Sequence, residues 1–192
     1  MKKAFLVIAL FASGVPFAQA GGNPHIQNLL EVFASNCGIS SPDFRKGTPA
    51  FARKNYAGKW QIITRGELEK CWECFDSAFV SSGNDGRHVV QIASTSETGD
   101  WSQFVLYCYG QDGKLSVALS DFNSVLGWAI VSRFSMKQGK VVEAPREFRD
   151  LKTWEVLAEK PDGAEQIYTS DKPALYSNLQ DLPFYSLLKV KR

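Results

Sequence analysis

The residues in this chain whose type and spacing most clearly suggest a chemical role are four cysteines. They are Cys37, Cys71, Cys74 and Cys108. An even number of cysteines in an oxidising compartment indicates two disulfides. Cys71 and Cys74 also have the Cys-x-x-Cys spacing of thiol–disulfide enzymes, in which a thiolate attacks a disulfide. Two hypotheses follow: a pair of structural disulfides, or a redox site at Cys71 and Cys74.

The local sequence favours structural disulfides. A redox Cys-x-x-Cys pair depends on a helix N-terminus, where the helix dipole stabilises the thiolate. Here a capping box at Thr64 and Glu67 starts the predicted helix about two turns before Cys71. The acidic side chains of Glu69, Glu73 and Asp76 would also raise a thiol pKa.

Helical geometry suggests which cysteines pair. At about 100° per residue, Cys71 lies within the apolar stripe of the predicted helix and Cys74 lies on its flank. Cys108 alternates with apolar residues as an interior strand residue does. We therefore expect Cys71 to bond to Cys108, joining helix to sheet, and Cys37 to bond to Cys74, joining two helices.

Metal and acid–base chemistry find little support. Zinc binding is not expected, because the chain has 2 histidines and neither Cys37 nor Cys108 has a second cysteine at metal-ligand spacing. A triad-type nucleophile would have to use His88 as its base. Carboxylates could instead meet across a sheet in a hydrolase or isomerase; the candidates are Asp100, Asp121, Glu143 and Glu147. Spacing selects no pair among them, so we predict no catalytic residue, metal or cofactor.

Aromatic and basic residues are the candidates for binding. Residues 45–65 contain six basic residues and no acidic residue. Aromatic side chains interleave with these bases, as on a surface for an anionic envelope polymer or another protein. Trp101 follows an expected loop at 97–100 and could meet a sugar or a partner protein. The candidate binding residues are therefore Phe51, Arg53, Lys54, Tyr56, Lys59, Trp60 and Trp101.

Residues 1–20 have the features of a bacterial export signal. Lys2 and Lys3 precede an apolar run at 4–12, and Ala18-Gln19-Ala20 is a small-x-small cleavage site. The run is too short for a permanent transmembrane helix. We expect cleavage after residue 20, which leaves 21–192 as a single domain in the periplasm or outside the cell, with no permanent membrane anchor. Loss of both lysines makes basic and acidic residues equal in number.

Two helices are predicted ahead of a sheet. Asn23 and Pro24 start a helix over 24–36, and the capping box starts a second one that ends near Ser81-Ser82-Gly83. Its apolar stripe consists of Leu68, Cys71, Trp72, Phe75, Ala78 and Phe79.

Beyond Arg87 the apolar pattern alternates, which predicts strands joined by hairpins. A strand is expected at 88–94, followed by hairpins of 104–109 with 115–119, of 128–136 with 141–148, and of 154–158 with 166–168, and by an edge strand at 184–190. The three hairpins are expected to turn at 111–113, 138–139 and 161–163. The fold class is thus α+β: two N-terminal helices packed on one face of a curved antiparallel β-meander of about six to seven strands, stapled by disulfides.

These observations predict an exported, disulfide-stabilised binding or inhibitory module. Two alternatives stay open: a thiol–disulfide oxidoreductase that uses Cys71 and Cys74, and a small hydrolase or isomerase with carboxylates in a sheet pocket. The partner of the binding module would be an anionic polymer or a protein if residues 45–65 form its contact surface.

Overall fold

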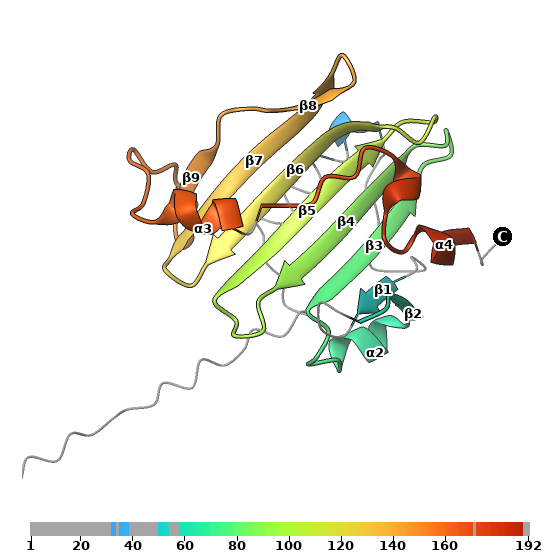
Figure 1. Ribbon diagram of the computed structural model, residues 1–192, viewed down its shortest axis with the longest axis horizontal. Helices are drawn as coiled ribbons and strands as arrows, with labels where there is room; N and C mark the ends of the chain where they lie inside the picture. Colours follow the sequence, from blue (N-terminus) through green and yellow to red (C-terminus); the bar gives the residue numbers. More distant parts are fainter. Residues whose placement is uncertain (1–31, 34, 39–49, 54–57, 171, 190–192) are drawn as a thin grey trace, which may run out of the picture.

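The computed structural model describes residues 32–33, 35–38, 50–53, 58–170 and 172–189. Within these residues, nine strands form one antiparallel sheet (Figure 1). The strands are β1 (Ala50–Arg53), β2 (Gln61–Ile63), β3 (Asp76–Ser82), β4 (His88–Thr95), β5 (Trp101–Tyr109), β6 (Leu115–Ser124), β7 (Trp128–Lys137), β8 (Lys140–Glu143) and β9 (Glu147–Asp150). The short helices are α2 (Arg65–Glu69), α3 (Ala164–Ser170), the 3-10 turn η2 (Leu179–Asp181) and α4 (Tyr185–Leu188).

Strands β3 to β7 form a meander in chain order. β1 pairs with both β2 and β3, and it extends the sheet at one edge. At the other edge, β8 pairs with the last residues of β7 and β9 pairs with its first residues.

Two segments far apart in sequence cover opposite faces of the sheet. Residues 172–189 pack on the face that carries Val90, Tyr107 and Phe134, which we call the C-terminal face. The Tyr107 hydroxyl donates to the backbone carbonyl of Ala174 at 2.6 Å, which ties this segment to the sheet. The other face, called the N-terminal face, carries Val89, Leu106, Leu119 and Val131, and it packs against Phe33 and Cys37.

The predicted fold class is wrong in its helices. The protein is mainly an antiparallel sheet, and its described helices are short. Most of the expected helix at 24–36 lies outside the described residues, although residues 32–33 and 35–36 are helical. The second helix is the clear error, because it ends at Glu69 and residues 76–82 form β3.

Two physical reasons explain why β3 is a strand. The sequence Asp-Ser-Ala-Phe-Val-Ser-Ser contains several weak helix formers, and its residues also fit an alternating pattern. β3 is paired along its whole length with β4 and along part of it with β1, so both of its neighbours supply backbone hydrogen bonds. Tertiary pairing therefore outweighs the helical spacing of the apolar residues.

Two C-terminal predictions also fail. The expected hairpin of 154–158 with 166–168 is absent from the described residues; 164–170 form α3, whose Ala164 and Tyr168 are buried one helical turn apart. The expected edge strand at 184–190 is replaced by α4, and Phe184 is fully buried at its start.

Local turn and cap signals are confirmed. Thr64 Oγ1 accepts from the Glu67 backbone N–H, and Glu67 accepts from the Thr64 backbone N–H, so the capping box is complete. Turns at Gly113 and Gly139 join β5 to β6 and β7 to β8, with positive φ at both glycines as these turns require.

All four cysteines are in disulfides, but the predicted pairing is wrong. Cys37 is bonded to Cys108, and Cys71 is bonded to Cys74. The expected pairing assumed a long helix that would carry Cys71 across the sheet. Because the helix ends at Glu69, Cys71 and Cys74 lie together in the turn between α2 and β3.

Candidate functional site

A row of polar side chains crosses one end of the C-terminal face. Arg53 on β1 is paired with Asp76 on β3, Asp76 with Ser94 on β4, and Ser94 with Gln103 on β5. Residues directly opposite each other in an antiparallel sheet point to the same side, so the four side chains form one row. In the same register Gln103 is paired with Phe122 on β6, where the row becomes aromatic.

The centre of this row is a buried carboxylate. Asp76 is 3% exposed, its Oδ2 lies 2.5 Å from Arg53 Nε, and its Oδ1 accepts a hydrogen bond from Ser94 Oγ at 2.6 Å. A buried charge requires such partners, because its desolvation is otherwise uncompensated. The Arg53 guanidinium also lies 5.6 Å from the centre of the Trp60 ring.

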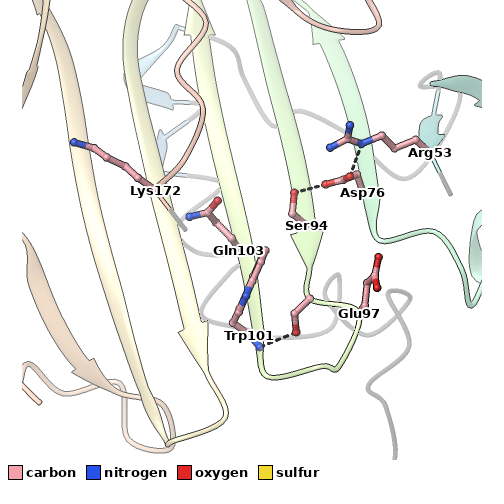
Figure 2. A pocket seen from close by; sticks show the side chains of 8 residues that line it. Arg53, Asp76, Ser94, Glu97, Trp101, Gln103 and Lys172 are labelled. Atoms are coloured by element: carbon pink, nitrogen blue, oxygen red, sulfur yellow. Dashed lines mark hydrogen bonds and ion pairs between the residues drawn. The ribbon is translucent and has the colours of Figure 1, made fainter. Parts of the chain in front are cut away.

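The row opens into a pocket with a volume of about 590 Å³, which we call the end pocket. Its walls are the polar row, the turn with Ser96 and Glu97, Trp101 at the start of β5, and Lys172. Figure 2 shows Arg53, Asp76 and Ser94 on one side and Lys172 on the opposite side. The pocket thus combines groups from four strands with the segment that covers the sheet.

Trp101 is held firmly at the mouth of the end pocket. Its backbone N–H donates to Ser96 Oγ at 3.3 Å, and its carbonyl accepts from the Ser96 backbone N–H at 3.1 Å. The indole is half-buried and stacks against Phe122, with ring centroids 5.7 Å apart. Trp101 therefore belongs to a strand and presents part of its ring to the pocket, whereas the sequence placed it after a loop.

Lys172 connects the end pocket to an ionic cluster near α3. Its Nζ lies 3.5 Å from Glu143 Oε2, and Arg146 binds the other oxygen of Glu143 at 2.7 Å. The hydrogen bond from Arg146 is the main cause that holds the pKa of Glu143 below its ordinary value, against the opposing effect of burial. The Tyr168 hydroxyl donates to the same carboxylate at 3.3 Å. The charge of Lys172 is therefore partnered within the protein.

The residues predicted in segment 45–65 do not all reach one surface. Phe51 is fully buried and stacks on Phe184, with ring centroids 4.8 Å apart. Trp60 packs against the same ring at 4.9 Å, while Lys59 is exposed. Lys54 and Tyr56 lie outside the described residues. Among the predicted binding residues, Arg53 and Trp101 are the two that line the end pocket.

The four candidate carboxylates lie in separate surroundings. Glu143 is held as described above, and Glu147 binds Arg133 and Arg149. The Arg133 hydrogen bond is the main cause that lowers the pKa of Glu147, against the opposing effect of burial. Asp100 accepts from the Thr98 hydroxyl at 2.5 Å in the β4–β5 turn.

Asp121 is the exception among these acids, because it is buried with no ion-pair partner among the described residues. It is 2% exposed, and no donor within the described part of the chain meets normal hydrogen-bond geometry at either carboxylate oxygen. Burial raises its pKa to about 7, while Asn123 and the positive charge of Arg149 act in the opposite direction. Since Phe122 shares a face with Gln103, its neighbour Asp121 points to the N-terminal face, away from the end pocket.

The remaining chemical candidates have local roles. His88 Nδ1 lies 2.8 Å from Ser82 Oγ, at the far end of β4 from the end pocket. Cys71 and Cys74 follow the C-terminal end of α2, and the helix field there disfavours a thiolate. The described residues contain no group of three or more His, Cys, Asp or Glu placed to hold a metal ion. None of the helices in these residues has the length and apolarity that crossing a membrane requires.

Sequence reasoning missed most of the end pocket. Asp76 was assigned to a helix, and Ser94, Gln103 and Lys172 carry no motif. A polar residue beside an apolar strand run, as Gln103 is, could have been noted as an interior polar group. Its partners are found only when the strand register is known.

Comparisons with known proteins add no function. No protein-family model matches the chain, and no curated protein matches it. A solved structure with some similarity is a hypothetical protein of unknown function from Leishmania major, described as a sequence homologue of human p32. It is 16% identical, the match covers 85% of this chain and 73% of that chain, and the TM-score is 0.20. A TM-score of this size does not establish a common fold, so nothing is transferred from that protein.

Proposed function

We propose that this protein is an exported binding module that holds a small polar ligand in the end pocket. The observation that carries the proposal is the polar row of Arg53, Asp76, Ser94 and Gln103, which opens beside the half-buried ring of Trp101. Binding pockets typically combine an aromatic or apolar wall with a few fixed polar groups. Asp76 is held on both oxygens, so this wall is already ordered before a ligand arrives.

Export is supported by the signal-like residues 1–20 and is consistent with the disulfides. A disulfide such as Cys37–Cys108 persists in the periplasm or outside the cell, while cytosolic thiols are kept reduced. Expression of the full chain in a bacterial host tests this part. We expect Gly21 as the first residue of the protein in the periplasmic fraction or the medium, as measured by intact mass. A cytosolic protein that retains residues 1–20 would contradict export.

A small-molecule screen tests binding. Amide chemical shifts of the ¹⁵N-labelled mature protein would be recorded against separate pools of sugars, amino acids, dicarboxylates and nucleosides. We expect one class to shift the amides of 94–97 and 101–103, and this effect to be lost in Trp101→Ala. Failure of every pool to shift these amides would exclude a small-ligand site in the end pocket.

A thiol–disulfide enzyme is the second candidate, because Cys71 and Cys74 are bonded to each other. Cys71 is partly exposed and Cys74 is buried, an arrangement that leaves one sulfur open to attack. Against this role stand the helix C-terminus and the acids Glu69 and Glu73. Titration with dithiothreitol and alkylation would decide. A reduction potential above about −270 mV supports the enzyme, and one below about −300 mV supports a structural disulfide.

Contact with an anionic polymer or another protein through segment 45–65 stays a prediction. Phe51 contributes to the core instead of to a contact surface, and Lys54 and Tyr56 are not described. Arg53 and Lys59 are the described bases within 50–60, and Arg53 is paired with Asp76.

A further inference from the structure

We infer that the ligand of the end pocket is a neutral carbohydrate, an inference that rests on the proposed binding function. Three properties of the pocket carry it: balanced charges, polar groups able both to donate and to accept, and a fixed tryptophan ring.

The charges that line the end pocket are balanced within the protein. Arg53 is paired with Asp76, and Lys172 is paired with Glu143 behind the pocket. Glu97, exposed at the mouth, adds a carboxylate that disfavours an anionic ligand. An anion would have to compete with Glu143 for Lys172 or with Asp76 for Arg53, and the buried Asp76 carboxylate would then lose its ion-pair partner. A neutral ligand avoids this cost.

The polar groups of the row suit hydroxyl groups. The Gln103 amide can donate and accept, the Ser94 hydroxyl, which donates its proton to Asp76, can accept, the Asp76 carboxylate accepts, and the Arg53 guanidinium donates. A sugar hydroxyl does both as well, so adjacent hydroxyls can bind adjacent groups of the row without displacing the ion pair. Gln103 is 7% exposed and lines the pocket with the rest of the row.

The Trp101 ring supplies the apolar part of the site. Phe122 covers part of the ring from within the sheet, and the ring also lines the end pocket beside Gln103. A pyranose has C–H groups on its faces and hydroxyls around its edge, so it can stack on an indole while its edge meets polar side chains. A volume of about 590 Å³ is within the range of small-ligand pockets and leaves room for one or two sugar rings.

Saturation-transfer NMR on the mature, disulfide-bonded protein tests the inference. The probes are three neutral disaccharides (cellobiose, maltose and N,N′-diacetylchitobiose), one anionic sugar (glucuronate) and one cationic amino acid (lysine). We expect transfer to at least one neutral disaccharide, and at least tenfold weaker binding of that probe in Trp101→Ala and in Gln103→Leu. Trp72→Ala is the matched control, because Trp72 is 84% exposed, does not line the end pocket, and should leave binding unchanged.

The outcomes separate the two proposals. Binding restricted to glucuronate or lysine, and lost in Trp101→Ala, would overturn the carbohydrate inference and leave the binding function in place. Disaccharide binding that survives both pocket substitutions would place the sugar elsewhere and overturn the inference. If the disaccharides fail and the pooled screen above also shifts no pocket amide, both proposals are wrong. Near-ultraviolet circular dichroism checks that Trp101→Ala remains folded. Trp101→Phe keeps an aromatic ring and should therefore retain part of the binding that Trp101→Ala loses.

Discussion

Cys37 is bonded to Cys108 across a sequence separation of 71 residues, and this bond holds the N-terminal segment against the end of β5. Both sulfurs lie in the core of the N-terminal face, where Cys37 is 2% exposed and Cys108 is 4% exposed. The Cys71–Cys74 bond has a separation of 3 and closes a single turn. The two disulfides therefore differ in what they do for the fold.

Removing the long-range disulfide is expected to destabilise the protein more than removing the short one. In the chain-entropy model, Cys37→Ser with Cys108→Ser costs about 4 kcal/mol, and Cys71→Ser with Cys74→Ser costs about 2 kcal/mol. Urea unfolding of the two double variants under non-reducing conditions measures the difference. Equal losses would show that local packing, and not loop closure, sets the contribution of each bond.

Asp121→Asn is expected to stabilise the protein at alkaline pH. Burial raises the pKa of this carboxyl from 3.8 to about 7, so the folded state holds its proton more tightly than the unfolded chain does. The stability that the neutral form provides is complete below about pH 4 and is lost as the pH rises through about 7. At pH 8 the gain from asparagine should be roughly 4 kcal/mol.

Unfolding at pH 4 and at pH 8 checks this prediction. The gain should be small at pH 4, where the aspartate is neutral in the folded state and about half protonated in the unfolded chain. Glu159→Gln, a change of an exposed acid to its amide, is the matched control and should have little effect at either pH. A gain of the same size at both pH values would mean that something other than ionisation of Asp121 causes it.

Phe184→Ala tests whether the C-terminal segment belongs to the core. Phe184 is fully buried and contacts the rings of Phe51 and Trp60. Its loss leaves a cavity between β1 and α4 and should cost about 3–5 kcal/mol. Thermal or urea unfolding gives the value, with Leu126→Ala as a control at a side chain that is 66% exposed. A loss below 1 kcal/mol in Phe184→Ala would show that residues 172–189 contribute little to the core.

Gln138→Asn should stabilise the β7–β8 turn. Gln138 has a φ of 53° and is followed by Gly139 with a φ of 76°. A left-handed conformation costs most residues about 1–2 kcal/mol, and asparagine tolerates it better, so the gain should be up to about 1 kcal/mol. Urea unfolding measures it. Lys140→Asn, at an exposed position outside the left-handed pair, should bring no gain. Destabilisation by Gln138→Asn would contradict the turn geometry.

The sequence correctly predicted the turns, the helix start and the alternating strands, which depend on only a few neighbouring residues. The capping box at Thr64 and Glu67 and the hairpin turns at Gly113 and Gly139 were predicted correctly, because each is set by short-range hydrogen bonds and by φ values that glycine permits. The strands of the meander from β4 to β7 were also recognised, since alternation reports which side chains are buried.

The candidate site could be predicted only in part. Trp101 and Arg53 were named from their residue types, and both line the end pocket. Asp76 was missed because the helical spacing of Leu68, Cys71 and Phe75 predicts that the helix continues through residues 76–82. In the structure these residues pair with their neighbours in the sheet and form β3. Lys172 was missed because nothing local relates it to β5.

By itself, the sequence determined the turns, the helix start, the alternating strands and the presence of four cysteines that could pair, because each of these is a property of adjacent residues. Only the tertiary structure decided that residues 76–82 are a strand, that Cys37 bonds to Cys108, and that Arg53, Asp76, Ser94 and Gln103 stand in one row. These features depend on strand register between segments far apart in the chain, and register is set by which pairings bury the most apolar surface and satisfy the most backbone hydrogen bonds.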